Sequence, residues 1–417
     1  MADLLVVGAG SAGAVIAGRA AVRHGLTVML IEAGPMHDAA ATPPSITGPN
    51  FHRALLEPGR VWPSGYPSGC GAGGSSAVNA MVAAAVPDGA DGEPSTLLQL
   101  HCAGVHERGP LATALASAAP SLGLAADDAL LTRTPDGRRW SVNDAYLEPA
   151  RATGRLAEVG NASVDRVLLE RGRAVGVRLA DGREFESGRV VVSAGAVRSP
   201  AILLRSGLIR SGIGRGLQDH PTLSVMVRLD DAAVAPWRGR EHQVVSVTTV
   251  VRAAHRRPGD LQLIAADGVR PDDLTAGVVM VSLMSVTSRG SVRLGGPAAL
   301  DEPVVEFPMT GDGADAADLD GVAAARALLD DVLATAAMRS ALAEVGEVTM
   351  GGAYHATSTC RMGRSDDDAA VVDHECRVLG TDGLFVCDAS VFPRVPMANP
   401  HVPVVLLAER MAAAICA

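Results

Sequence analysis

The sequence predicts a mixed α/β fold in which a Rossmann-type nucleotide-binding domain is interleaved with a domain built on an antiparallel sheet with flanking helices. Three observations predict it: a glycine turn between two buried strands at the start, alternating polar and apolar stretches over residues 223–310, and a return to strand and helix near the end. The 417 residues, 48% of them hydrophobic, supply a core for one large domain or two moderate ones.

The first element is a continuous apolar run over residues 4–7, which predicts a buried strand. It ends in a turn with Gly8, Gly10 and Gly13, and a helical pattern follows over residues 14–21. A second buried strand is predicted over 27–31, with Glu32 at its carboxyl end. A tight glycine turn in an unrelated α/β unit would share the glycines, but the flanking strands and the acidic residue favour dinucleotide binding.

The next elements are fewer and less regular. Residues 35–74 are dense in Pro and Gly and predict no regular structure, and residues 88–140 predict little beyond a helix near 111–119. Alternating runs at 164–169 and 174–179 predict a hairpin, and the apolar run at 189–192 predicts a central strand.

Residues 223–310 alternate polar and apolar positions in several stretches, for example 223–227 and 291–294, which fits an antiparallel sheet. A helix is expected over 318–337, a strand over 384–387 and a last helix over 402–415. We therefore expect a discontinuous nucleotide-binding domain of residues 1–85, 141–222 and 349–417. The substrate or cap domain is expected over 86–140 and 223–348.

Composition excludes several classes of protein. The net charge is −10, from 46 acids against 36 bases, and aromatic residues are 3% of the chain, which argues against binding of nucleic acid or a membrane surface. The six cysteines form no CxxC pair, so neither a disulfide scaffold nor a metal site is expected. With its first strand at residue 4 and no apolar run of spanning length, the chain is expected to be soluble and cytoplasmic. The sequence leaves the oligomeric state open.

Five separated segments resemble the glucose-methanol-choline (GMC) oxidoreductases, a family of FAD-dependent alcohol oxidases and dehydrogenases. The resemblance lies in the glycine turn with Glu32-Ala33-Gly34, in Gly73-Gly74-Ser75-Ser76-Ala77-Val78-Asn79, in Gly195-Ala196-Val197-Arg198-Ser199-Pro200, in Gln218-Asp219-His220-Pro221, and in His355 to Gly363 with Cys387-Asp388-Ala389 and Ala398-Asn399-Pro400-His401. The chain is an unusually short member by this comparison. We therefore expect a reduced lid over the active site.

The resemblance implies that FAD is the cofactor. Ala77 stands near the position where some members carry a flavin-linking His, so FAD is expected to be held noncovalently. The expected FAD contacts are Gly8, Gly10, Ser11, Ala12, Gly13, Glu32, Ala33, Gly74, Ser75, Asn79, Val164, Ala194, Asp388, Ala389, Pro400 and His401. A backbone turn at a helix start suits a pyrophosphate, and Glu32 suits the ribose hydroxyls.

His355 and Asn399 match the family's catalytic base and its partner. An imidazole suits removal of a hydroxyl proton near neutral pH, and an amide suits orientation of the substrate oxygen. The alternatives are a core histidine at 355 and a turn-forming Asn before Pro400. His401 is expected beside the flavin or at the cap of the last helix. His220 and Cys360 are expected to have packing or supporting roles.

The function implied by the resemblance is oxidation of a primary or secondary alcohol to an aldehyde or ketone, with hydride transfer to flavin N5. The trimmed substrate region suggests a bulky, natural-product-like substrate. Dioxygen and another electron acceptor both remain open as partners. An alternative is a lyase of the hydroxynitrile-lyase kind, with structural, non-redox FAD, and a third possibility is a flavoprotein that serves as a scaffold.

Overall fold

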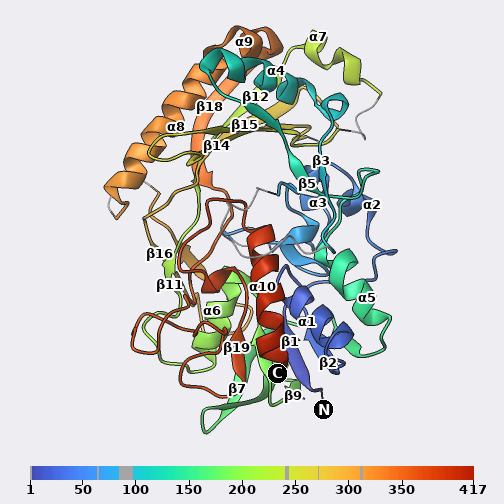
Figure 1. The fold of residues 1–417 in the computed structure, drawn as a ribbon, viewed down its shortest axis with the longest axis vertical. Helices are drawn as coiled ribbons and strands as arrows, with labels where there is room; N and C mark the ends of the chain where they lie inside the picture. The colour runs from blue at the N-terminus through green and yellow to red at the C-terminus, as the bar shows by residue number, and fades with distance from the viewer. Residues whose placement is uncertain (1, 63–64, 84–96, 240–243, 271, 310–312) are drawn as a thin grey trace.

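The computed structural model describes residues 2–62, 65–83, 97–239, 244–270, 272–309 and 313–417. Its lower half in Figure 1 holds a parallel sheet, and its upper half holds an antiparallel sheet under three helices. The elements of the two halves alternate along the chain. The structural neighbours described below share this fold, which confirms the predicted mixed α/β class.

The parallel sheet has the strand order β19-β10-β1-β2-β6, and every neighbouring pair in it is parallel. Its strands are β1 (Leu4–Val7), β2 (Val28–Ile31), β6 (Leu156–Val159), β10 (Val190–Val192) and β19 (Leu384–Val386). Strands β1, β10 and β19 are fully buried, as expected for a parallel sheet covered on both faces. The predicted strands at 4–7, 27–31, 189–192 and 384–387 are all present.

Two helices far apart in sequence, α1 (Gly13–Val22) and α10 (His401–Cys416), pack side by side on this sheet (Figure 1). Arg19 of α1 forms a two-pronged ion pair with Glu409 of α10, at 2.6 and 2.5 Å. Tyr146 donates its hydroxyl to the same carboxylate at 2.6 Å. Because this charge pair is largely buried, removing one partner would leave a charge without compensation.

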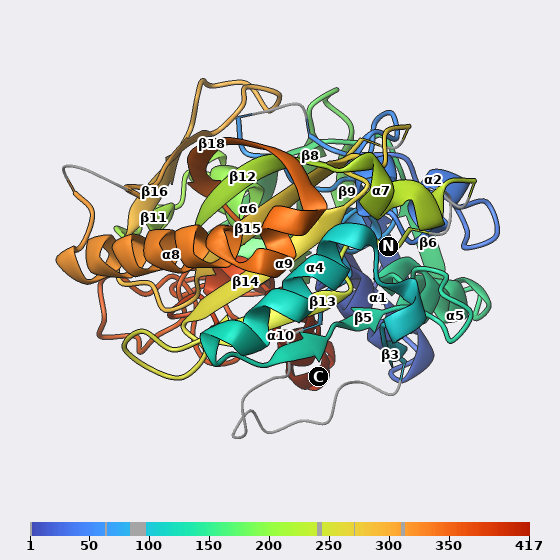
Figure 2. The ribbon, with the colours of Figure 1, turned by 90° about the horizontal axis from the view of Figure 1, so that it is seen from above.

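The antiparallel sheet has the order β18-β12-β15-β14-β13-β4. Its strands are β4 (Ala126–Asp128), β12 (Pro221–Leu229), β13 (Thr249–Ala253), β14 (Leu261–Asp267), β15 (Ala276–Leu283) and β18 (Leu342–Gly352). Figure 2 shows α4 (Pro110–Ala118), α8 (Ala316–Ala334) and α9 (Ala336–Ala341) lying over its outer face.

Side chains of the four strands β12, β13, β14 and β15 alternate between the two faces of this sheet. Odd-numbered residues such as Val225, Leu263 and Val281 join the core under the three helices. Even-numbered residues such as Ile264 and Met280 face the opposite side, toward the half that holds the parallel sheet. This alternation follows from the two-residue period of a strand.

The remaining elements connect or flank these sheets. A three-stranded sheet contains β7 (Val164–Glu170), β8 (Arg173–Leu179) and β9 (Glu184–Glu186), the first two forming the predicted hairpin. The other strands are β3 (Leu100–Cys102), β5 (Leu130–Thr132), β11 (Arg215–Leu217), β16 (Gly290–Arg293) and β17 (Val304–Glu306). The other α-helices are α2 (Pro44–Thr47), α3 (Phe51–Leu55), α5 (Glu148–Arg151), α6 (Gly195–Arg205) and α7 (Asp231–Val234). Short helical turns are η1 (Gly74–Ala77), η2 (Val105–Glu107), η3 (Ala119–Leu122), η4 (Asn143–Leu147), η5 (Ala235–Trp237) and η7 (Ala389–Val391).

Two expectations about local structure were wrong. Residues 35–74 contain the short helices α2 and α3, the first starting at a proline and the second capped by Asn50, so the Pro-rich composition marked helix starts rather than an extended path. The strand at 291–294 belongs to a separate sheet, β11-β16-β17, and not to the large antiparallel one.

Two of the expected domain boundaries fall inside strands. The boundary at 222/223 lies near the start of β12, and the one at 348/349 lies within β18, whose whole length pairs with β12. Part of the expected cap segment 86–140 lies outside the described residues. The rest of that segment supplies α4 and β4 to the antiparallel half.

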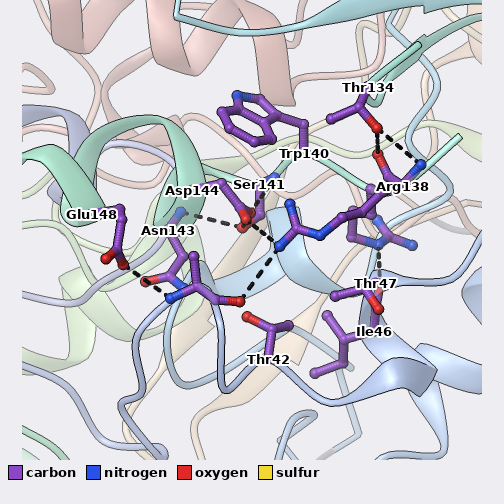
Figure 3. A network of polar contacts seen from close by, with 12 residues as sticks. Thr42, Ile46, Thr47, Thr134, Arg138, Trp140, Ser141, Asn143, Asp144 and Glu148 are labelled. Carbon is purple, nitrogen blue, oxygen red and sulfur yellow. Dashed lines mark hydrogen bonds and ion pairs between the residues drawn. The ribbon is translucent and has the colours of Figure 1, made fainter. Parts of the chain in front are cut away.

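A polar network links the α2 region to residues 134–148 (Figure 3). Arg138 donates to Asp144 at 2.6 Å, and the other carboxylate oxygen of Asp144 accepts from the amide and hydroxyl of Ser141. Arg139 donates to the carbonyl of Ile46 at 2.9 Å and to Asn79 at 2.9 Å. The buried Arg139 thus links the α2 region to the segment of residues 73–79, which includes Asn79.

Within the described part of the chain, no helix combines the length and the apolar character needed to cross a bilayer.

Candidate active site

One large cavity, of about 920 Å³, lies between the two halves of the molecule. Its walls come from the carboxyl ends of parallel strands and from the inner face of the antiparallel sheet. That position is where open α/β sheets bind their ligands. The cavity is lined by all but one of the predicted site residues: Gly8, Gly10, Ser11, Ala12, Glu32, Ala33, Gly74, Ser75, Asn79, Val164, Ala194, His355, Asp388, Ala389, Asn399, Pro400 and His401.

The exception is Gly13, which does not line the cavity. A Cβ at Gly13 would lie 1.9 Å from the carbonyl oxygen of Gly8. Gly13 therefore allows α1 to pack closely on the turn, and its part in cofactor binding is indirect.

Two glycine segments meet backbone to backbone at one wall. Gly8 has φ +101°, and a Cβ there would lie 2.5 Å from the carbonyl oxygen of Ser193. A Cβ at Gly74 would lie 2.6 Å from the Cα of Gly10. No side chain fits at these contacts, so main-chain atoms form this part of the cavity surface, here called the glycine wall, and its close approach suits a pyrophosphate. The amides of Gly8 and Gly74 themselves donate to the carbonyls of Ile31 and Gly71.

Glu32 joins three loops at the end of β2. Its carboxylate accepts hydrogen bonds from the amides of Ala9 (2.7 Å), Gly34 (2.9 Å) and Gly71 (2.8 Å). Glu32 therefore has a structural role that the sequence did not predict. A ribose hydroxyl bound to Glu32, as the sequence predicts, would share its carboxylate with these three amides.

His401, at the first turn of α10, contacts the glycine turn. Its Nδ1 lies 2.9 Å from the hydroxyl oxygen of Ser11. Burial, with a smaller contribution from Arg139, lowers the pKa of His401 to about 4, so the ring is neutral. Its Nε2 is buried without a hydrogen-bond partner among the described residues. His401 therefore retains an unused polar atom at the cavity wall.

Asp388 follows β19 and caps the start of α6. Its carboxylate accepts from the Gly195 amide at 2.8 Å, the Ser199 hydroxyl at 2.6 Å and the Ser390 amide at 2.8 Å. Burial raises its pKa above the ordinary value. Asp388 lines the cavity as predicted, and it also fixes the turn that carries Ala194.

A pair of histidines lies at the other end of the cavity. The Nδ1 atoms of His355 and His220 are 2.9 Å apart, and His220 Nε2 lies 3.0 Å from the carbonyl oxygen of Pro396. Burial lowers the pKa of His220 to about 4 and that of His355 well below its ordinary value, so both rings are neutral.

We assign the protons from this chain of contacts. A carbonyl oxygen can only accept, so His220 carries its proton on Nε2, and its Nδ1 must accept. His355 therefore donates from Nδ1 and keeps a lone pair on Nε2. That is the tautomer a general base requires.

Asp219 supports both histidines from behind. It accepts from the backbone amides of His220 at 2.7 Å and His355 at 2.8 Å, and from the hydroxyl of Tyr66 at 2.8 Å. Burial raises the pKa of Asp219 to about 6. The Tyr66 hydroxyl in turn accepts from the Ala356 amide at 2.8 Å, so the Asp219 carboxylate and the Tyr66 hydroxyl together fix the backbone beside His355.

Asn399 lies in the same cavity as His355, and its side-chain oxygen is 3.4 Å from Nε2 of Gln262 on β14. The sequence did not single out Gln262 or Tyr66. A polar residue at a cavity-facing position between Leu261 and Leu263 was the available signal for Gln262. Nothing local marks Tyr66, because its partner Asp219 is distant in sequence.

Cys360 is buried beside this site, and burial raises the pKa of its thiol. Its expected packing role fits that environment. Among the described residues, no group of three or more His, Cys, Asp or Glu side chains is arranged to hold a metal ion.

Two GMC oxidoreductase profiles match the chain, over residues 99–222 and 286–408, and together they cover more than half of it. The chain belongs to the GMC oxidoreductase family.

Two sequence relatives span nearly the whole chain, and a third spans about two thirds of it. A GMC-type oxidoreductase of Rhodococcus erythropolis is 28% identical over 99% of this chain and 98% of its own length. The 5-(hydroxymethyl)furfural oxidase of a Methylovorus species is 29% identical over 99% and 98%. An oxygen-dependent choline dehydrogenase of Brucella anthropi is 29% identical over 66% of this chain and 60% of its own.

Among solved structures, pyridoxine 4-oxidase from Mesorbium loti superposes with a TM-score of 0.82 at 23% identity, covering 99% of each chain. A formate oxidase superposes with a TM-score of 0.84 at 17% identity, covering 99% of this chain and 98% of the other. These superpositions establish a shared fold.

The described residues fit the FAD that GMC oxidoreductases bind. The glycine wall lets a phosphate group approach the main chain closely, and the positive end of the 16-residue helix α10 opens on the cavity at Pro400 and His401. His401 Nε2 supplies an unpaired polar atom beside them.

Proposed function

We propose that this protein is an FAD-dependent oxidoreductase that oxidises a primary or secondary alcohol to an aldehyde or ketone. The observation that carries the proposal is the hydrogen-bond chain from Pro396 through His220 to His355, which leaves a basic Nε2 in the same cavity as Asn399. FAD is proposed to be held noncovalently along the glycine wall, with dioxygen or another electron acceptor completing the cycle.

In the proposed reaction, His355 Nε2 takes the hydroxyl proton of the substrate, and His220 holds the ring in the tautomer that can accept it. The Asn399 amide hydrogen-bonds the substrate oxygen, and Gln262 restrains that amide from the sheet. Bound FAD supplies a two-electron acceptor for the hydride that leaves the alcohol carbon. The enzyme thus keeps the proton on a protein side chain while the carbon–oxygen double bond forms.

The test is a visible spectrum of the purified protein under anaerobic conditions, before and after addition of a panel of alcohols, followed by admission of air. We expect yellow flavin bands that bleach with an alcohol. The rate at which the colour returns in air then distinguishes an oxidase from a dehydrogenase. Colourless protein that cannot be loaded with FAD would contradict the proposal at its first step.

The matched variant is His355→Gln, which keeps a polar side chain and removes the base. We expect flavin content to be retained and the rate of anaerobic bleaching to fall by about 10² to 10⁴ fold. Bound flavin that no alcohol bleaches, combined with cleavage of a cyanohydrin, would replace this proposal with the lyase alternative.

A further inference from the structure

The inner face of the antiparallel sheet forms one wall of the cavity, and the strand register arranges its side chains in rows. Across β12, β15 and β14, the first row pairs Thr222 with Ser282 and Ser282 with Gln262. The second row is Ser224, Met280 and Ile264, and the third is Met226, Val278 and Ala266. The rows therefore lose polarity in one direction along the strands.

The polar row is the one next to the proposed catalytic pair. Gln262 contacts Asn399 at 3.4 Å, and the Thr222 hydroxyl donates to the carbonyl of His220 at 3.1 Å. Thr222 and Ser282 also share a hydrogen bond of 2.8 Å. A substrate's reacting hydroxyl would therefore meet a wall of neutral hydrogen-bonding groups.

The rows further from the pair face an apolar surface. Ile264, Met280 and Val278 form a cluster with Met81, Val82 and Phe51, which line the cavity from the other half. No charged side chain lines the cavity from the described part of β12, β14, β15 or β18. Arg252 continues the first row on β13, but it is exposed, lies outside the cavity lining and has its Cδ close to Gly259.

The carboxylates that do line the cavity are engaged within the protein. Glu32 and Asp388 accept from the backbone amides described above, Glu302 pairs with Arg198 at 3.0 Å, and Asp301 accepts from the Ala298 amide at 2.7 Å. The guanidinium of Arg198 also covers the ring of Trp62, 3.6 Å from its centroid. Each of these carboxylates therefore already accepts hydrogen bonds from groups of the protein.

We infer that the substrate is an uncharged alcohol with an apolar body, whose hydroxyl lies at the polar row and whose body lies against Ile264, Met280 and Val278. The inference rests on the proposed function. It distinguishes this chain from a choline-type enzyme, because a quaternary ammonium buried against Met280 would lose its hydration without gaining a counter-charge.

The test uses two alcohols of the same shape, choline and its uncharged isostere 3,3-dimethylbutan-1-ol, in anaerobic flavin reduction. We expect the second-order rate constant for the uncharged alcohol to exceed that for choline by about 100-fold or more. An anionic probe, 4-(hydroxymethyl)benzoate, should be disfavoured to a similar degree relative to benzyl alcohol. Bleaching by choline at an equal or higher rate would overturn the inference while leaving the proposed function in place.

Three variants test whether Met280, in the second row, sets the preference for an uncharged alcohol. Met280→Glu should narrow or reverse the preference for 3,3-dimethylbutan-1-ol over choline, whereas Met280→Gln, of the same shape without charge, should keep it. Met226→Glu is the matched control, because Met226 is on the same face but is 47% exposed and outside the cavity lining. An equal response to Glu at both positions would show that general surface charge sets the preference, and would overturn the inference. Absence of bleaching by every alcohol would instead count against the proposed function.

Discussion

At the scale of the residue, the proposed base His355 depends on its neighbour His220, which holds it in one tautomer. Replacing His220 with Leu removes the acceptor for His355 Nδ1–H, so the base loses its fixed tautomer. We expect the limiting rate of flavin reduction to fall by about 10- to 100-fold, with little change in the substrate concentration for half-saturation. Stopped-flow reduction under anaerobic conditions measures both quantities.

The control for that prediction is His220→Asn, whose side-chain oxygen can accept the same proton. It should recover part of the lost rate. If the Leu and Asn variants are equally slow and both fold, the role of His220 is to fill space rather than to orient His355.

The pH dependence of the reaction also belongs to this scale. The neutral form of His355 is the active base, and its pKa lies well below its ordinary value because the ring is desolvated and faces His220. We therefore expect the limiting rate to stay level as pH falls from 8 to about 6, and to drop only on further acidification. Asp219, with a pKa of about 6, and its partner Tyr66 face the same backbone, so Tyr66→Phe should be measured in parallel. An acid limb at pH 6.5 or above in the wild-type protein would contradict the assigned environment of His355.

At the scale of the element, helix α4 is held on the sheet by one buried acid. Asp267, at the end of β14, accepts from the amides of Leu111 at 2.8 Å and Ala112 at 3.1 Å, and burial raises its pKa to about 7. In the unfolded chain this carboxyl ionises near its ordinary value of 3.8. The unfolded state therefore releases its proton first as pH rises, and the fold loses stability between about pH 4 and 7.

Asp267→Asn should abolish this part of the pH dependence. We expect the free energy of unfolding of the wild-type protein to fall relative to that of the variant between about pH 4 and 7, by on the order of a few kcal/mol. Thermal melts at several pH values check it. Parallel curves for the two proteins would show that Asp267 is already ionised in the fold at pH 5.

The elements that sequence could predict are those with a periodic or glycine signal of their own. The glycine turn, the central strands of the parallel sheet, the 164–179 hairpin and α10 all carry such a signal. The separate β11-β16-β17 sheet does not, because its membership depends on pairing between residues far apart in sequence. For the same reason His355 could be named from its motif, but the bond to His220, 135 positions away, could not.

At the scale of the whole molecule, the cavity separates two hydrophobic cores, so a ligand that fills it contacts both halves. We expect FAD to raise the melting temperature in a concentration-dependent manner, and flavin-depleted protein to melt several degrees lower. Gly8→Ala should lose the flavin, because the added Cβ would lie 2.5 Å from the carbonyl oxygen of Ser193. The ratio of flavin to protein absorbance and the thermal shift measure both effects.

The matched control is Gly25→Ala. Gly25 also has a positive φ, of +66°, but nothing lies within 4 Å of a Cβ built there. This variant should carry backbone strain and still retain flavin. Equal flavin loss in both variants would mean that general destabilisation, and not the shape of the glycine wall, causes the loss.

The strict alternation of faces along β14 and β15 has a consequence for how this enzyme can evolve. Even-numbered positions can change with the substrate while odd-numbered positions keep the helix-covered core, so single substitutions can alter selectivity at low cost to folding. A one-residue insertion or deletion within either strand would exchange the even-numbered and odd-numbered side chains and place core leucines in the cavity. New specificities in this lineage should therefore arise through point substitutions in these strands, with changes in length confined to the loops between them.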